Sequence, residues 1–224
     1  MWRDAVLVAA KDLRVEARSR VATNQVLPFA VLVLVLFAFA LEPDRGLLRT
    51  AAAGLFWVAV LLATVLAVSR SAALEAGDGG RDALRLSGLD PAGVFLGKAG
   101  AVAVQLVALE LVLGLGVVVL YDIEPTGLGT LAVTAVVATL GLAAAGTLYG
   151  AVAAGLRVRE TLLPLLLLPV VAPVLLAATR ASESALGTGV AGIDAGQWLG
   201  LLGVFAVVYL GVGVVAFGSL LEDS

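Results

Sequence analysis

The chain contains no cysteine and no histidine, and its one methionine is Met1. It therefore has no residues for disulfide bonds or thiol chemistry, and it lacks the side chains that most often bind transition metals. Any metal ion would have to be bound by carboxylates. Charge is also scarce, because Asp, Glu, Lys and Arg make up 14% of the 224 residues, whereas about 25% is usual in soluble domains.

Hydrophobic residues are correspondingly abundant. They make up 61% of the chain, and aromatic residues only 6%, so the excess lies in Ala, Val and Leu, accompanied by 26 glycines. Transmembrane helices favour these small and aliphatic residues. The composition predicts an all-α integral membrane protein whose surroundings are the lipid bilayer, and we expect no nucleic-acid partner.

Six segments are long and apolar enough to cross the hydrocarbon core, which takes about 20 mostly apolar residues in a helix. They cover residues 22–41, 51–68, 99–121, 128–154, 162–178 and 197–218. We expect residues 1–224 to form a single membrane domain built from six transmembrane helices.

The basic residues predict the orientation of these spans. Eleven of the 14 Lys and Arg residues precede the first span or lie in the second and fourth connections, and three lie in the first and fifth. Because basic residues of short loops stay in the cytoplasm, both termini should be cytoplasmic. A cleavable signal peptide ending at Ala38-Phe39-Ala40 is disfavoured, since the polar segment before the first span is longer than the usual n-region.

Residues 1–21 are predicted to form an amphipathic helix in the cytoplasmic interface of the membrane. Apolar side chains recur at three- and four-residue steps, and cations lie on another side: Trp2, Val6, Ala9, Leu13 and Ala17, then Lys11, Arg14 and Arg18. Such a stripe beside cations is typical of helices that lie along a membrane surface. The alternative is a flank that only sets the topology.

The second connection, residues 69–98, contains the longest polar stretch, GDGGRDALRLSGLDP. It lacks the Lys-Ser or Lys-Thr of a P-loop and the closing Glu of a calcium loop. We expect glycines to end the helix that leaves the second span, and a short helix to follow, with two leucines that require a partner surface. The residues of this predicted coupling element are Gly77, Asp78, Gly79, Gly80, Asp82, Leu84, Leu86 and Pro91.

Glu110 lies near the middle of the third predicted span, where an acidic residue costs about 2.5–3.5 kcal/mol. Such a cost requires a partner or a protonated state. Glu110 is therefore either a functional polar point between helices or a structural residue that is hydrogen-bonded to Gln105 or Thr139.

Three prolines in the fifth predicted span, Pro164, Pro169 and Pro173, each remove a backbone donor and favour a bend. They form either a flexible gate or a fixed kink. In the fourth span, Gly141, Ala145, Gly146 and Gly150 predict close helix packing. We expect the fifth connection, TRASESALGTGVAGIDAG, which follows the fifth span, to be extracytoplasmic and mobile.

Five stretches spread over nearly the whole chain carry a resemblance to a known family: DLRVEARSR, LPFAVLVLVLFAFAL, GLFWVAVLLATVLAVSR, LEAGDGGRDALRLSGLDPAGVFLGK and LLPLLLLPVVAPVLLAATRA. The chain resembles the CcmB family, heme exporter protein B of the system-I cytochrome c maturation apparatus, which is related to ABC-2 type permeases. The resemblance implies a permease of the prokaryotic inner membrane whose coupling helix, between spans 2 and 3, docks into a separate ATPase subunit.

The resemblance also implies the partners and the pathway. The partners would be a cytoplasmic ABC ATPase that binds ATP and magnesium, a second copy of this chain and a heme-handling membrane protein. The complex would export heme or release a heme-loaded chaperone. The alternatives are a permease for drugs or polysaccharides and a non-transporting assembly scaffold.

We expect no directly bound cofactor and no catalytic residues in this chain. Of the usual heme-iron ligands, only Met1 and three tyrosines are present, Tyr121, Tyr149 and Tyr209. An intramembrane enzyme would need a base beside its acid, and Glu110 has no His or Lys near it in sequence. The sequence therefore favours a mechanical role coupled to a heme-binding partner.

Overall fold

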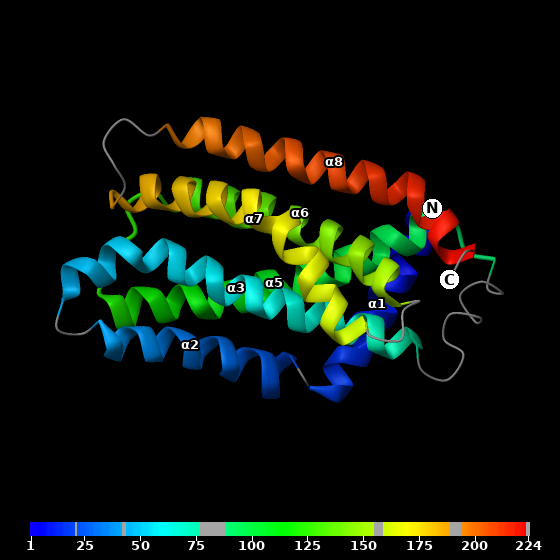
Figure 1. Ribbon diagram of the computed structural model, residues 1–224, viewed down its shortest axis with the longest axis horizontal. Coiled ribbons are helices and arrows are strands. Elements are labelled where there is room, and N and C mark those ends of the chain that lie inside the picture. Colours follow the sequence, from blue (N-terminus) through cyan, green and yellow to red (C-terminus); the bar gives the residue numbers. More distant parts are fainter. Residues whose placement is uncertain (21, 42–43, 77–87, 155–158, 189–193, 223–224) are drawn as a thin grey trace.

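The computed structural model describes all residues except 21, 42–43, 77–87, 155–158, 189–193 and 223–224, and its described part is helical. In chain order the elements are α1 (Trp2–Ser19), the π-helical turn η1 (Ala22–Val26), α2 (Leu27–Ala40), α3 (Arg45–Ala76), α5 (Pro91–Tyr121), α6 (Leu128–Ala154), α7 (Arg159–Leu186) and α8 (Ala195–Glu222). This arrangement is shown in Figure 1.

Five helices, α3, α5, α6, α7 and α8, are long and apolar enough to cross a membrane, which makes the chain a multi-pass membrane protein. The number rises to six if α1 and the next helix, Asn24–Ala40, which are bent by 54° relative to each other, count as one crossing. The predicted first span, 22–41, corresponds to η1 and α2. Six spans and their orientation stay predictions.

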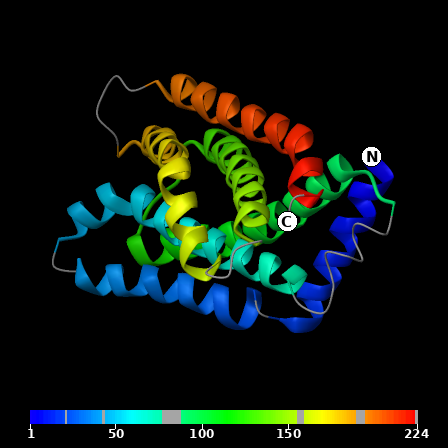
Figure 2. The ribbon, with the colours of Figure 1, turned by 45° about the vertical axis from the view of Figure 1, so that its right-hand side comes forward.

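Helices α2 to α8 lie side by side in a bundle, and α1 lies across one end of it (Figures 1 and 2). Helix α6 contacts α3, α5, α7 and α8. Met1 and the end of α8 lie at the same end of the bundle as α1, and we call this end the terminal end (Figure 1).

The predicted glycine packing of α6 is confirmed. A Cβ atom at Gly146 would lie 2.6 Å from Cγ2 of Val68 on α3, and one at Gly141 would lie 3.0 Å from Cδ1 of Phe205 on α8. Glycine therefore lets α3 and α8 approach α6 more closely than any side chain would allow.

The predicted boundary of the fifth span is wrong, because α7 continues to Leu186 and includes the first part of the connection that was expected to be mobile. Ala181 is buried there, and the buried Ser182 accepts a hydrogen bond at 3.0 Å from Nε1 of Trp57, whose side chain is 1% exposed. The polar residues of this stretch predicted a loop, but they continue the helix, and Ser182 among them is buried. Helix α7 also continues through all three prolines as one bent helix (Figure 1), and whether they gate or kink stays a prediction.

The predicted start of the third span is also wrong, because α5 begins at Pro91 rather than at residue 99. The Asp90 carboxylate accepts a hydrogen bond from the Ala92 amide at 3.1 Å and caps the helix, and Pro91 occupies the first turn. Pro91, a residue of the predicted coupling element, therefore starts α5. The predicted coupling segment 69–98 overlaps the last turns of α3 and the first turns of α5.

Candidate functional site at the terminal end of the bundle

Helix α1 packs against α5 through two glycines, Gly93 and Gly97. A Cβ atom at Gly93 would lie 2.7 Å from the carbonyl oxygen of Met1, and one at Gly97 would lie 2.6 Å from that of Ala5. Cβ atoms do not approach other heavy atoms this closely, so only glycine permits the contact. The four-residue spacing of Gly93 and Gly97 is visible in the sequence, but no sequence pattern indicates that α1 is the helix that packs on them.

Helix α1 forms within the predicted residues 1–21, and it carries apolar side chains on two faces. Ala5 and Val8 are buried against the bundle, whereas the predicted stripe begins with Trp2 and Val6, which are 74% and 66% exposed. Exposure of these two side chains fits a helix whose stripe faces lipid. Its location in the membrane interface stays a prediction.

Two ion pairs join α1 to the helices on either side of the coupling segment. Asp12 Oδ2 lies 3.7 Å from Nζ of Lys98 on α5, and the Lys98 side chain is 4% exposed. Glu16 Oε2 accepts a hydrogen bond from Nε of Arg70 on α3 at 3.3 Å. A buried ammonium is stable only when it is paired, so the Asp12 contact fixes α1 on α5 as well as neutralising Lys98.

A polar contact also lies where α5 begins. Asp4 Oδ2 accepts hydrogen bonds from the Met1 ammonium at 3.1 Å and from the Asp90 amide at 3.4 Å. The bond from the ammonium lowers the pKa of Asp4 below its ordinary value, and the bond from the Asp90 amide adds to this. Helix α1 is thereby linked to the residue that caps α5.

Most of the predicted coupling element lies outside the described residues: Gly77, Asp78, Gly79, Gly80, Asp82, Leu84 and Leu86. Pro91 is described and lies in the first turn of α5. The two helices that flank this element, α3 and α5, are the two that α1 joins.

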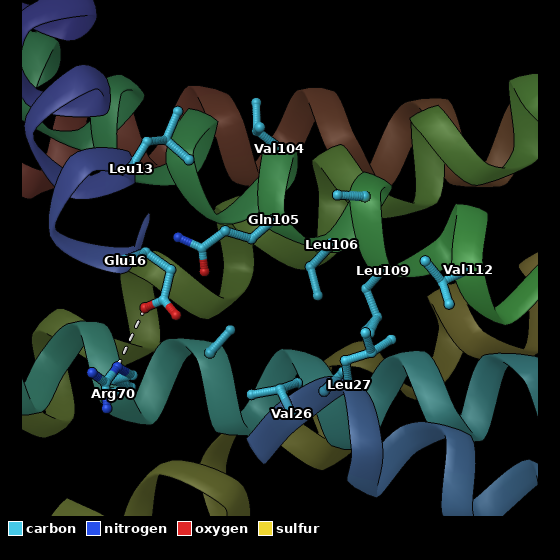
Figure 3. Close-up of a pocket in the computed structure, with 13 residues that line it drawn as sticks. Leu13, Glu16, Val26, Leu27, Arg70, Val104, Gln105, Leu106, Leu109 and Val112 are labelled. Carbon is cyan, nitrogen blue, oxygen red and sulfur yellow. Dashed lines mark hydrogen bonds and ion pairs between the residues drawn. The ribbon is translucent and has the colours of Figure 1, made fainter. Parts of the chain in front are cut away.

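A groove of about 330 Å³ lies between α1, η1, α2, α3 and α5 (Figure 3). Glu16, Arg70 and Gln105 are its polar residues. The rest of its wall is apolar and includes Leu13, Val26, Ala67, Val104, Leu109 and Val112. Figure 3 shows Gln105 on the Glu16 side of the groove and Val112 far from it, so the groove is polar at one end and apolar at the other.

The structure separates the two polar residues of the third predicted span. Gln105 lines the groove, whereas Glu110, five residues on, lies about 140° around the helix. Glu110 is 5% exposed and accepts a hydrogen bond from the hydroxyl of Thr139 on α6, one of its two expected partners. Its Oε2 atom has no hydrogen-bond partner among the described residues. A role for Glu110 beyond this contact stays a prediction.

Carboxylates and tyrosines are the residue types that the sequence offered as possible ligands for a metal ion or for heme iron. Within the described part of the chain, no group of three or more carboxylates is placed to hold a metal ion. The Tyr121 hydroxyl donates to the carbonyl oxygen of Leu34 at 3.1 Å and is buried. The rings of Tyr149 and Tyr209 pack against each other with centroids 6.5 Å apart.

Comparison with known proteins gives consistent matches. The family model described as "CcmB protein" matches residues 3–224. "Heme exporter protein B" of Paracoccus denitrificans is 29% identical over 219 residues, 95% of this chain and 95% of that protein. The protein of the same name from Rhodobacter capsulatus is 33% identical over 169 residues, 75% of this chain and 77% of that protein. The one from Haemophilus influenzae is 30% identical over 185 residues, 80% of each chain.

Proposed function

The chain belongs to the CcmB family, and we propose that it is the permease subunit of an ATP-driven ABC transporter complex that exports heme for cytochrome c maturation. The observation that carries this proposal is the family match over residues 3–224, together with relatives named heme exporter protein B. The chain is a multi-pass protein of the prokaryotic inner membrane. Its task in the complex is transport, and ATP hydrolysis belongs to a partner.

We place six crossings in the membrane and both termini in the cytoplasm. Two features support this orientation. Met1 and the end of α8 lie at one end of the bundle, as an even number of crossings requires (Figure 1). Helix α1, which holds most of the basic residues that precede the first span, lies at the same end.

Coupling to the ATPase is assigned to the segment between α3 and α5. Leu84 and Leu86 provide its apolar contacts with a cytoplasmic ATPase subunit that holds ATP and magnesium. The contacts of α1 with both flanking helices support this role. A force that the ATPase exerts on the segment is then transmitted to α3 and α5 together, instead of bending the end of one helix. A second copy of the chain and a heme-handling membrane protein complete the complex.

A second candidate is ATP-driven release of a heme-loaded chaperone, without passage of heme through this subunit. The tyrosine contacts favour it. The Tyr121 hydroxyl is already bonded to a backbone carbonyl, and the sequence holds no histidine or cysteine that could bind the iron.

The proposal is tested by replacing Leu84 and Leu86 with Asp in the full chain and purifying the membrane complex through a tag on this subunit. We expect the ATPase to be lost, because charged side chains cannot enter an apolar docking site without a partner. Val15→Asp is the matched control, because Val15 is 38% exposed on α1 at the same end of the bundle and outside the segment.

The co-purifying proteins distinguish the alternatives. Retention of the ATPase by the double variant would favour a scaffold over a coupled permease. An ATPase that arrives with a heme-handling membrane protein supports the cytochrome c pathway, whereas a drug-exporter ATPase alone contradicts it.

A further inference from the structure

The charged residues of α1 are sorted between two faces of the helix. Its three acidic side chains make the contacts with Asp90, Lys98 and Arg70 described above, so they face the bundle. The basic side chains of the helix are exposed instead: Arg3, Lys11, Arg14 and Arg18. With 3.6 residues per turn, these four lie within an arc of about 80° around the helix. We call this arc the basic face of α1.

The charge of the basic face is not balanced within the described part of the chain. Its three arginines make no ion pair with a described residue. Lys11 Nζ lies 2.8 Å from Oδ1 of Asp12, but the other oxygen of the same carboxylate contacts Lys98. Like charges three and four residues apart, as at Lys11, Arg14 and Arg18, destabilise a helix. The basic face therefore favours an anion from outside the chain.

Helix α1 lies at the depth of lipid headgroups. It packs on α5 at Gly93 and Gly97, in the first two turns of that helix. Helix α5 has 31 residues and is therefore about 46 Å long, whereas the hydrocarbon core of a bilayer is only about 30 Å thick. The first turns of α5 thus extend into the headgroup layer, and α1 lies there with them.

Apolar side chains border the basic face. Trp2 and Val6 are exposed and line an apolar recess of about 340 Å³. Leucines of three membrane-crossing helices also line it: Leu96 of α5, Leu140 of α6 and Leu210 of α8. Arg3 and Arg14 lie about 60° and 80° from Val6 around the helix. Cations at the edge of an apolar stripe reach headgroup phosphates while the stripe contacts acyl chains.

We propose that the basic face of α1 binds anionic phospholipids in the leaflet at the terminal end of the bundle. Headgroup phosphates accept hydrogen bonds from the three arginines of this face, and Trp2 and Val6 contact the acyl chains beside them. The inference goes beyond the proposed function, because it names the class of lipid that this subunit selects, whichever species the complex moves.

Net charge selects anionic lipids over zwitterionic ones. In an ethanolamine or choline headgroup an ammonium group accompanies the phosphate, so such a lipid brings no net negative charge to the basic face. A glycerol headgroup leaves the charge of its phosphate uncompensated. Each basic residue close to an anionic membrane surface strengthens binding about fivefold.

The test measures which lipids co-purify with the full-length chain from vesicles that contain equal amounts of phosphatidylglycerol and phosphatidylcholine with identical acyl chains. Mass spectrometry of the extracted lipids gives the ratio of the two. We expect phosphatidylglycerol to be enriched more than about tenfold, and a wash with about 1 M salt should lower the enrichment, because exposed charges are then screened beyond about 3 Å. Equal amounts of the two lipids would overturn the proposal.

Two arginines locate the binding to α1. Arg14→Gln and Arg18→Gln should each lower the ratio of phosphatidylglycerol to phosphatidylcholine about fivefold. Both side chains are exposed, so the substitutions leave the contacts of α1 with the bundle in place. Arg14→Lys and Arg18→Lys should keep the wild-type ratio, because they keep the charge. A double glutamine variant with the wild-type ratio would overturn the proposal.

The matched control is the double variant Arg49→Gln, Arg180→Gln. It removes the same amount of charge near the start of α3 and the end of α7, away from the terminal end (Figure 1). Each of these two arginines already has an acidic partner, Asp122 or Glu183. The control should therefore keep the wild-type lipid ratio, and a loss as large as that of the α1 variant would contradict binding at the basic face.

An acidic surface of a protein partner is the rival occupant of the basic face. The recess beside it favours lipid, because it is lined by helices that cross the membrane. Purification of the double variant Arg14→Gln, Arg18→Gln with its partner proteins distinguishes the two. A lowered lipid ratio with all partners retained supports the proposal, whereas loss of a partner with an unchanged lipid ratio would overturn it.

Discussion

Packing of α1 against α5 leads to a prediction that compares two glycines one turn apart. In Gly97→Ala the new Cβ would lie 2.6 Å from the Ala5 carbonyl oxygen and 2.7 Å from the Val8 Cβ, so α1 must move. Both contacts are with rigid atoms, and overpacking of this kind costs about 1–3 kcal/mol. In Gly100→Ala the new Cβ has no neighbouring atom within 4 Å. Replacing a helical glycine with alanine raises the free energy of unfolding by about 0.5–1 kcal/mol.

The two variants should therefore change the free energy of unfolding in opposite directions. The assay is denaturant unfolding of the purified chain in one detergent, monitored by helical circular dichroism. Gly97→Ala should be less stable than the wild type, and Gly100→Ala at least as stable. The difference between the variants should be about 1–3 kcal/mol, the overpacking cost, because the helix-propensity gain of alanine is common to both. Equal stability of the two would refute the close contact between α1 and α5.

Three further predictions concern polar contacts between helices. Asp12→Ala should lower the free energy of unfolding by about 1.5–3 kcal/mol, because it removes a charged partner from the buried Lys98. Arg49→Gln should lower it by less than about 1 kcal/mol, because the Arg49–Asp122 pair is exposed, and a loss as large as that of Asp12→Ala would contradict this. Trp57→Phe should lower the free energy of unfolding by about 1–3 kcal/mol, because Ser182 loses its buried hydrogen-bond donor. A double-mutant cycle with Ser182→Ala checks this, and additive effects of the two substitutions would contradict the hydrogen bond.

Composition and hydropathy predicted the class of the molecule and the position of several helices. The fourth predicted span, 128–154, matches α6, and the third ends at Tyr121 as α5 does. These boundaries were accessible because a change from apolar to polar residues marks them. Where polar residues continue a helix, as in α7 up to Leu186, the same rule placed the boundary too early.

Contacts between distant segments were less accessible. Because an acidic residue is costly in a membrane, the sequence required a partner for Glu110 and offered Thr139 and Gln105 as candidates. Only the arrangement of the helices shows that Thr139 is the partner and that Gln105 lines the groove instead. The groove is formed by elements from α1 to α5, so no local pattern predicts it. The pairs of α1 with Lys98 and Arg70 likewise depend on how α1 crosses the bundle.

The most direct test of the central claim is a measurement of covalently bound heme in c-type cytochromes of cells that lack this protein. With the chain restored, heme-stained c-type cytochromes should return, whereas the Leu84→Asp and Leu86→Asp double variant should leave them absent while b-type cytochromes stay at wild-type levels. Normal c-type cytochromes in cells without the protein would contradict a role in their maturation.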